Sequence, residues 1–111
     1  MSKTLLLLSC VFASPVLATG LEIEIAGEAN GTVTIDLLED VAPKHAEQIT
    51  ALAAQGAYDG VVFHRVIDGF MAQTGDVKNG VLGSDAFDMR MVGTGGSDRP
   101  NLPAEFSDLP F

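Results

Sequence analysis

The sequence predicts a mainly β domain with one capping helix, an α+β fold, in the order strand, strand, helix, strand, strand. Two pairs of β-rich segments are each joined by a turn dipeptide, Asn30-Gly31 in the first pair and Asp68-Gly69 in the second. A single segment between the pairs has the spacing of an amphipathic helix. The length of 111 residues allows one small domain.

Residues 1–18 have the three-part order of a secretory signal peptide. Lys3 supplies a positive charge, an apolar run covers residues 5–12, and Ala18 ends a stretch suited to cleavage. The run is too short to cross a bilayer, which takes about 20 apolar residues. We expect cleavage after Ala18, a mature domain of residues 19–111 without membrane insertion, and a periplasmic or secreted location. A buried N-terminal strand or helix is the competing interpretation.

The charge and the metal-binding side chains limit the possible functions. The formal net charge is -9, and the loss of Lys3 with the signal peptide makes it -10. This acidity argues against nucleic acid, whose phosphates need clustered Lys and Arg, and against docking on anionic lipid. Cys10 is lost with the signal peptide, and His45 and His64 are not at metal-ligand spacing. We expect no metal and no cofactor.

The first pair of strands is predicted over residues 21–38. Residues 21–25 alternate apolar and acidic side chains, which is the period of a half-buried strand. A second strand covers residues 32–38, with its apolar side chains at alternate positions. Between them, Asn30-Gly31 favours the positive φ angles of a tight type I′ turn, so the two strands are expected to form a β-hairpin.

Residues 43–55 are predicted to form a short amphipathic helix. Pro43 suits the first helical turn, where its missing N–H is not needed. Gly56 is placed to end the helix in a left-handed conformation. The apolar side chains expected on one face are Ala46, Ile49 and Ala53.

The second pair of strands is predicted over residues 61–67 and 70–74, joined by Asp68-Gly69. Residues 75–103 are rich in Gly and Pro and predict a long surface loop. Four strands and one helix would make an open sheet with free edges.

The second hairpin gathers the residues best suited to a site. Strand alternation places Phe63 and Arg65 on one face and His64 on the other. Met71 and Gln73 share a face of the returning strand, so Arg65 is expected to project beside both. A cation and an amide would then border an apolar patch.

Such a patch suits a reaction in which no nucleophile attacks. Prolyl isomerisation is one, because amide resonance makes rotation cost ~18–20 kcal/mol and the uncatalysed X-Pro bond takes ~10–100 s to isomerise. Twisting the bond leaves a more basic proline nitrogen. A donor aimed at that nitrogen binds the twisted state better than either planar state. A pocket of Phe and Met would hold the proline ring.

The segment FHRVIDGFMAQTGD, residues 63–76, closely resembles the core pattern of cyclophilins. Residues 42–45, 56–60 and 103–106 also resemble the family, and the resemblance covers residues 21–111. The details are most similar to exported bacterial members. The resemblance implies a peptidyl-prolyl cis-trans isomerase that assists protein folding. Its expected partners are proline-containing peptides and unfolded exported proteins.

The resemblance also implies roles for individual residues. Arg65 is expected to be the catalytic guanidinium, and Gln73 to position the substrate backbone beside it. His64 is expected to be packed or structural. The residues expected to bind the substrate are Phe63, Phe70 and Met71.

Cyclophilins close an eight-stranded barrel capped by two helices, whereas this sequence carries the first half and one helix. We therefore expect a partial cyclophilin-like antiparallel β-barrel, C-terminally truncated, with the second half of the barrel missing. Besides an active isomerase, two alternatives remain open. One is a non-catalytic proline-peptide-binding or chaperone-like half-domain, and the other is an inactive truncated fragment.

Overall fold

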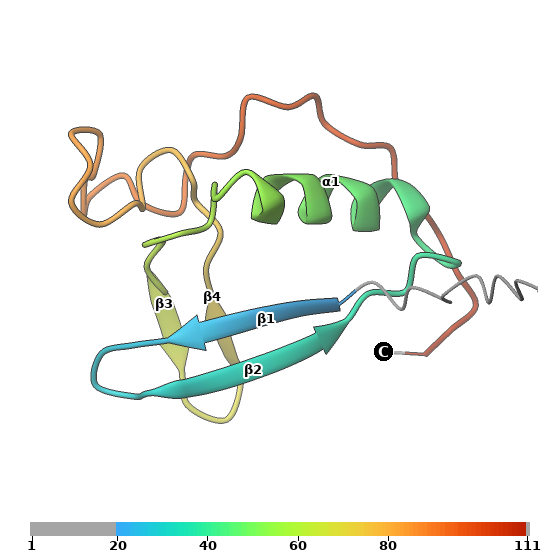
Figure 1. The fold of residues 1–111 in the computed structure, drawn as a ribbon, viewed down its shortest axis with the longest axis horizontal. Helices are drawn as coiled ribbons and strands as arrows, with labels where there is room; N and C mark the ends of the chain where they lie inside the picture. Colours follow the sequence, from blue (N-terminus) through green and yellow to red (C-terminus); the bar gives the residue numbers. More distant parts are fainter. Residues whose placement is uncertain (1–19, 111) are drawn as a thin grey trace, which may run out of the picture.

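The computed structural model describes residues 20–110. The predicted signal peptide, residues 1–18, lies outside the described residues. The order of elements is the predicted one, with a single helix between two strand pairs (Figure 1). The elements are β1 (Gly20–Ile25), β2 (Gly31–Asp36), α1 (Pro43–Ala54), β3 (Arg65–Ile67) and β4 (Met71–Gln73).

The β1–β2 hairpin is confirmed, and its two faces differ as the sequence pattern predicts. The strands are antiparallel, with Leu21 opposite Ile35 and Ile23 opposite Val33. Directly opposite residues project from the same face, so these four apolar side chains share one face of the hairpin. The acidic residues of β1 alternate with its apolar residues and are exposed.

The predicted type I′ turn at Asn30-Gly31 is wrong. Gly31 already belongs to β2, where it is opposite Ile25, so the connection is a longer loop of residues 26–30. The Asn30 side chain explains the difference. Its Oδ1 accepts a hydrogen bond from the Gly27 N–H at 3.2 Å, and its Nδ2 donates to the Gly27 carbonyl at 3.1 Å. Asn30 therefore closes a wider loop instead of forming the centre of a tight turn.

Helix α1 forms where predicted, and its C-terminus ends as expected. Gly56 has φ +74°, the left-handed conformation that glycine adopts at low cost. The Gly56 N–H donates to the Ala53 carbonyl and the Ala57 N–H to the Leu52 carbonyl, both at 3.0 Å. This pair of hydrogen bonds is a Schellman motif.

The second hairpin is confirmed, but its strands are shorter than predicted. Gly69, with φ +70°, forms the turn between β3 and β4, as Asp68-Gly69 predicts. The first residues of the predicted strand pair elsewhere. Val61 forms an isolated bridge with Val81, and the Val62 N–H donates to the Gly80 carbonyl at 2.9 Å. A segment of the predicted loop therefore takes the place of a longer β4.

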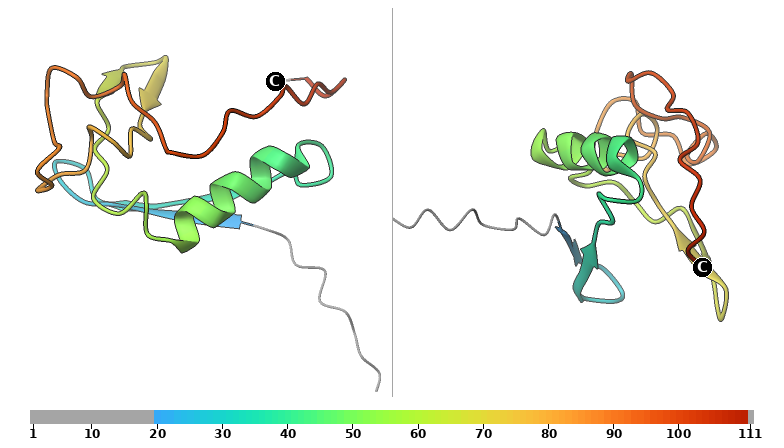
Figure 2. Two further views of the ribbon diagram at one scale, coloured as in Figure 1. Left: turned by 90° about the horizontal axis from the view of Figure 1, so that it is seen from above. Right: turned by 90° about the vertical axis from the view of Figure 1, so that its right-hand side faces the viewer.

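The two hairpins form two separate two-stranded sheets, so the expectation of one open four-stranded sheet is wrong. Helix α1 lies over the β1–β2 hairpin, and β3–β4 runs crosswise to it at one end (Figures 1 and 2). No closed barrel is present within residues 20–110. In the described part of the chain each hairpin pairs only with itself, so each sheet has two free edges.

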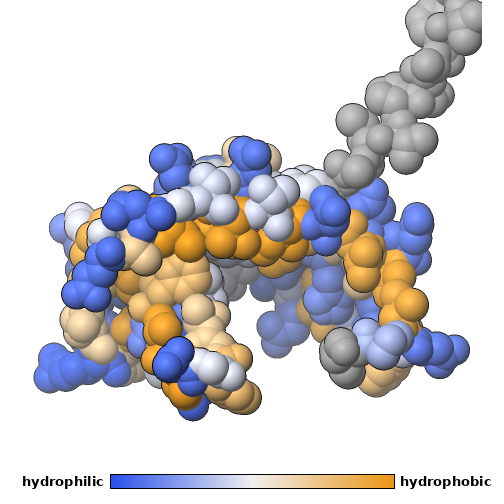
Figure 3. Space-filling model, turned by 90° about the horizontal axis from the view of Figure 1, so that it is seen from below, coloured by the Kyte–Doolittle hydropathy of each residue, from blue (hydrophilic) through white to orange (hydrophobic). Residues whose placement is uncertain are grey.

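The core is small. Within residues 20–110 the buried hydrophobic side chains are Ala46 and Leu52, both on α1, and the buried charged side chain is Asp76. Larger apolar side chains stay exposed, among them Val33 and Ile35 of β2. Hydrophobic residues form a band across the underside of the molecule, where two arms flank an open hollow (Figure 3). This much exposed apolar surface is unusual for a soluble monomer.

Candidate active site

The β3–β4 hairpin brings together Arg65, Gln73 and Met71. Arg65 is directly opposite Gln73, and Ile67 is directly opposite Met71. Because directly opposite residues project from the same face, the guanidinium, the amide and the two apolar side chains share one face of the hairpin. The predicted placement of Arg65 beside Met71 and Gln73 is confirmed. The Asp-Gly turn keeps this register by leaving three residues between the strands.

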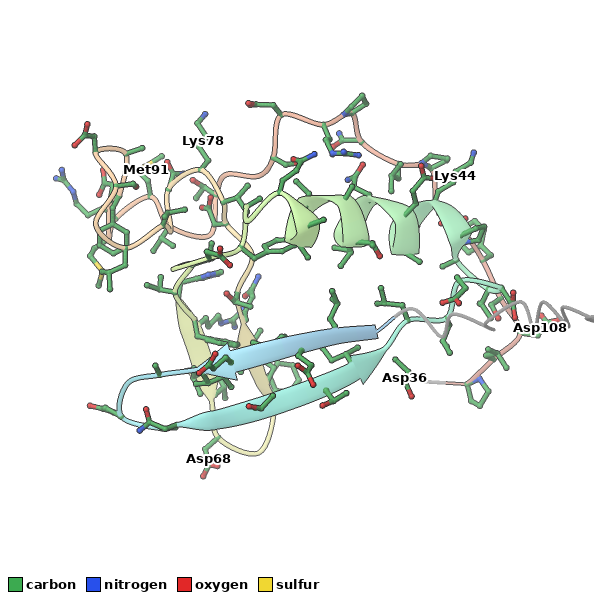
Figure 4. All side chains as sticks on the ribbon, viewed as in Figure 1. Asp36, Lys44, Asp68, Lys78, Met91 and Asp108 are labelled. Carbon is green, nitrogen blue, oxygen red and sulfur yellow. The ribbon has the colours of Figure 1, made fainter. Side chains whose placement is uncertain are left out.

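Arg65 is exposed, and its side chain forms no hydrogen bond or ion pair with another residue in the described part of the chain. A guanidinium without an internal carboxylate partner keeps all of its N–H donors available to a ligand. Asp68, the charged residue of the turn, points away from the rest of the molecule at the tip of the hairpin (Figure 4).

The two phenylalanines expected to bind the substrate, Phe63 and Phe70, are more exposed than side chains that line an enclosed pocket. Phe70 follows Gly69 in the turn and is 76% exposed, and Phe63 precedes β3 and is 36% exposed. The structure therefore places both beside the Arg65 strand without covering them. One groove, of about 410 Å³, lies along α1, and another, of about 610 Å³, lies between the end of α1 and residues 97–100. Neither is lined by a predicted site residue.

His64 immediately precedes β3, its N–H donates to the Gln73 carbonyl at 3.1 Å, and its side chain is half-buried. Its ring packs against Gly93, where an added Cβ would come within 2.8 Å of the His64 Nε2. The His64 Nδ1 is buried and has no hydrogen-bond partner among residues 20–110. These contacts agree with a packed rather than a catalytic side chain.

Sequence reasoning gave no role to Asp76, which organises the loop behind the hairpin. Its Oδ1 accepts hydrogen bonds from the N–H groups of Lys78 and Asn79, and its Oδ2 accepts those of Gly93 and Gly95, all between 2.7 and 3.0 Å. Asp76 is only 3% exposed. The hydrogen bond from Asn79 is the main cause that holds the pKa of Asp76 well below its ordinary value, against the opposing effect of burial.

Part of the role of Asp76 was visible in the sequence. An Asp followed within three residues by Asn-Gly is typical of a side chain that caps its own turn, which predicts the bonds to Lys78 and Asn79. The bonds to Gly93 and Gly95 join residues more than 16 positions apart. No local pattern predicts them.

Glu105 is the second residue that sequence reasoning missed. Its carboxylate accepts the backbone N–H groups of Lys44 and His45 at the start of α1 and contacts the His45 ring. Glu105 thereby accepts helix N–H groups that the N-cap residue leaves unpaired, because the methyl side chain of Ala42 has no hydrogen-bond acceptor. Within residues 20–110 no group of three or more His, Cys, Asp or Glu side chains is placed to share a metal ion.

Known proteins are similar to this chain over the part that contains both hairpins and α1. The family model described as "Cyclophilin type peptidyl-prolyl cis-trans isomerase/CLD" matches residues 21–110. A probable peptidyl-prolyl cis-trans isomerase of Brucella suis is 60% identical over 82 residues, which are 74% of this chain and 41% of that protein. A putative peptidyl-prolyl cis-trans isomerase of Staphylococcus haemolyticus is 42% identical over 66 residues, 59% of this chain and 33% of that protein.

The chain spans about two fifths of the length of the Brucella relatives that it matches. No solved structure matches it significantly. The family match nevertheless extends from β1 to the last described residue and includes both hairpins and α1. The chain belongs to the cyclophilin-type peptidyl-prolyl cis-trans isomerase family.

Proposed function

We propose that the chain acts as a peptidyl-prolyl cis-trans isomerase through the Arg65 face of the β3–β4 hairpin. The observation that carries the proposal is the register that sets Arg65 opposite Gln73 and beside Met71. The family membership and the names of the relatives support the same activity.

Each side chain of this face has a chemical task in the proposed reaction. Arg65 donates a hydrogen bond to the proline nitrogen, whose lone pair becomes available only when the X-Pro bond is twisted. Because this bond strengthens in the twisted state, Arg65 lowers the barrier rather than merely binding the substrate. Gln73 holds a neighbouring peptide group. Met71, with Phe63 and Phe70, provides the apolar surface for the proline ring.

An isomerisation assay tests this role of Arg65. We expect the Arg65→Ala variant to lose roughly 100-fold or more in kcat/KM, the range found when one preorganised donor to a transition state is removed. Arg90→Ala is the matched control, since Arg90 is also exposed and lies far along the chain, in the loop near Asp88. Equal activity of Arg65→Ala and the unchanged chain would refute the mechanism.

A second candidate function is binding of proline-containing or unfolded chains without turnover. The observation that favours it is the exposure of Phe70 and of other large apolar side chains, which offers contact surface without an enclosed pocket. Binding of a proline peptide, with no acceleration of its isomerisation by the chain, would select this function over the first.

We also propose that the protein is exported, with periplasmic or secreted unfolded proteins as substrates. Support comes from the signal-peptide pattern of residues 1–18. Within residues 20–110 no helix is both long and apolar enough to cross a membrane. Mass spectrometry of the protein from the extracytoplasmic fraction should find Thr19 at the N-terminus. An intact Met1 in every fraction would contradict export by signal cleavage.

A further inference from the structure

The segment of residues 97–106, which we term the strap, runs alongside α1 in the opposite direction to the helix (Figures 1 and 2). At its beginning, residues 97–100 and the end of α1 line the groove of about 610 Å³. At its far end, Glu105 reaches the N-terminus of α1, where Lys44 lies (Figure 4). The strap has no regular secondary structure, so contacts with the rest of the molecule must hold it in place.

Glu105 makes a concentrated set of contacts. Its Oε2 accepts the Lys44 N–H at 3.1 Å, and its Oε1 accepts the His45 N–H at 2.8 Å. The same Oε1 lies 2.5 Å from the His45 Nδ1. The Glu105 side chain is 13% exposed and that of His45 is 48% exposed. One carboxylate therefore joins two segments that are 60 residues apart in the sequence.

The two ends of the strap differ in how firmly they are held. Next to its start, the Gly95 N–H donates to Asp76, a buried carboxylate that also accepts three other backbone N–H groups. At the other end, the ring of His45 is half in solvent. The start of the strap is thus anchored beside a buried carboxylate, and we expect its Glu105 end to open first because the His45 ring is half exposed.

We propose that Glu105 and His45 form an acid-sensitive clasp, which holds the strap against α1 while Glu105 is ionised and releases it when Glu105 is protonated. His45 is the titratable side chain that contacts Glu105 among residues 20–110, and Lys44 contributes its backbone N–H. Protonation removes the negative charge that both backbone donors and the ring bind, and charge-assisted hydrogen bonds are about twice as strong as neutral ones.

The direction of the pH effect follows from Glu105. Burial alone would raise its pKa, but the hydrogen bonds from the His45 ring and from the His45 and Lys44 N–H groups outweigh burial and lower the pKa of Glu105. A carboxyl group whose pKa is lower in the folded than in the unfolded state stabilises the folded state at pH values above its unfolded-state pKa. This stabilisation is lost as the pH falls through the lowered value, so the clasp is closed at neutral pH and opens in acid.

Amide hydrogen exchange by NMR on the full 111-residue chain tests the clasp. We expect the protection factors of the Lys44 and His45 N–H groups to fall about tenfold or more between pH ~7 and pH ~3, the interval in which a Glu carboxyl titrates. The His64 N–H, which donates to the Gln73 carbonyl in the second hairpin, is the internal reference. Its protection factor should stay unchanged over the same interval.

Two variants complete the test. Glu105→Gln keeps the shape but lacks the charge, so protection of Lys44 and His45 should be low at every pH. Asp108→Asn is the matched control, because Asp108 lies on the same terminal segment and makes no hydrogen bond or ion pair with the described residues. If Glu105→Gln does not fold, the titration of the unchanged chain decides alone. Protection of Lys44 and His45 that is independent of pH, or that is lost together with that of His64, overturns the proposal.

Discussion

At the scale of single residues, the local part of the candidate site could be predicted and the distant part could not. The register of Arg65, Gln73 and Met71 follows from strand alternation and a short Asp-Gly turn. Both signals lie within the nine residues 65–73. The partners of Asp76 and Glu105 lie up to 61 residues away. Such contacts depend on the path of the whole loop, which no local pattern specifies.

Gly93 provides a residue-scale test of the packing behind Arg65. It has φ +99°, and an added Cβ would meet the His64 ring at 2.8 Å. We expect Gly93→Ala to lower the free energy of unfolding by about 1–2 kcal/mol from the backbone alone, with the clash adding to it. Urea denaturation measures this change.

Gly96→Ala is the control for that prediction. Gly96 has no positive φ, and no atom of the described residues lies within 4 Å of the position of an added Cβ. Its free energy of unfolding should stay within about 0.5 kcal/mol of the unchanged chain. If the two alanine variants are equally stable, His64 does not pack on Gly93 as described.

At the scale of elements, helix α1 was predicted well because its signals are local. Pro43 begins it, Gly56 ends it in a Schellman motif, and both act within one turn of the helix. The turn at Asn30-Gly31 was predicted wrongly for a local reason as well. The Asn30 side chain bonds back to Gly27, and this competes with the tight turn that the dipeptide otherwise favours.

Leu52 tests how much of the stability of α1 comes from packing. It is 7% exposed and is one of the buried hydrophobic side chains of the described residues. We expect Leu52→Ala to lower the free energy of unfolding by about 2–3 kcal/mol, at the low end for such a change because the core is small. Leu38→Ala is the control, since Leu38 is 60% exposed and its truncation should cost far less. Equal losses in the two variants would show that α1 has no packed core.

At the scale of the whole molecule, the sequence predicted two hairpins but not their separation into two sheets. Pairing within a hairpin is set by its turn, whereas pairing between hairpins depends on contacts across α1 and the long loop. The result, for residues 20–110, is four free strand edges and an exposed apolar band on the underside (Figure 3). Free edges and apolar surface are both templates for association.

We therefore expect the chain to self-associate or to unfold without a sharp transition. Sedimentation velocity over a wide range of concentrations should detect species larger than the monomer, and thermal melts should be broad. The expectation fails if the chain remains a monomer at every concentration and melts in one sharp cooperative step.

The central claim is that the Arg65 face of β3–β4 turns over X-Pro bonds, and exchange NMR of a proline peptide tests it most directly. Magnetisation exchange gives the cis-trans rate of the peptide, while the amide resonances of Arg65, Met71 and Gln73 report where the peptide binds. We predict exchange much faster than the uncatalysed time of ~10–100 s, with the shifts centred on these three residues. Exchange at the uncatalysed rate, or faster exchange with shifts confined to other parts of the chain, would contradict the claim.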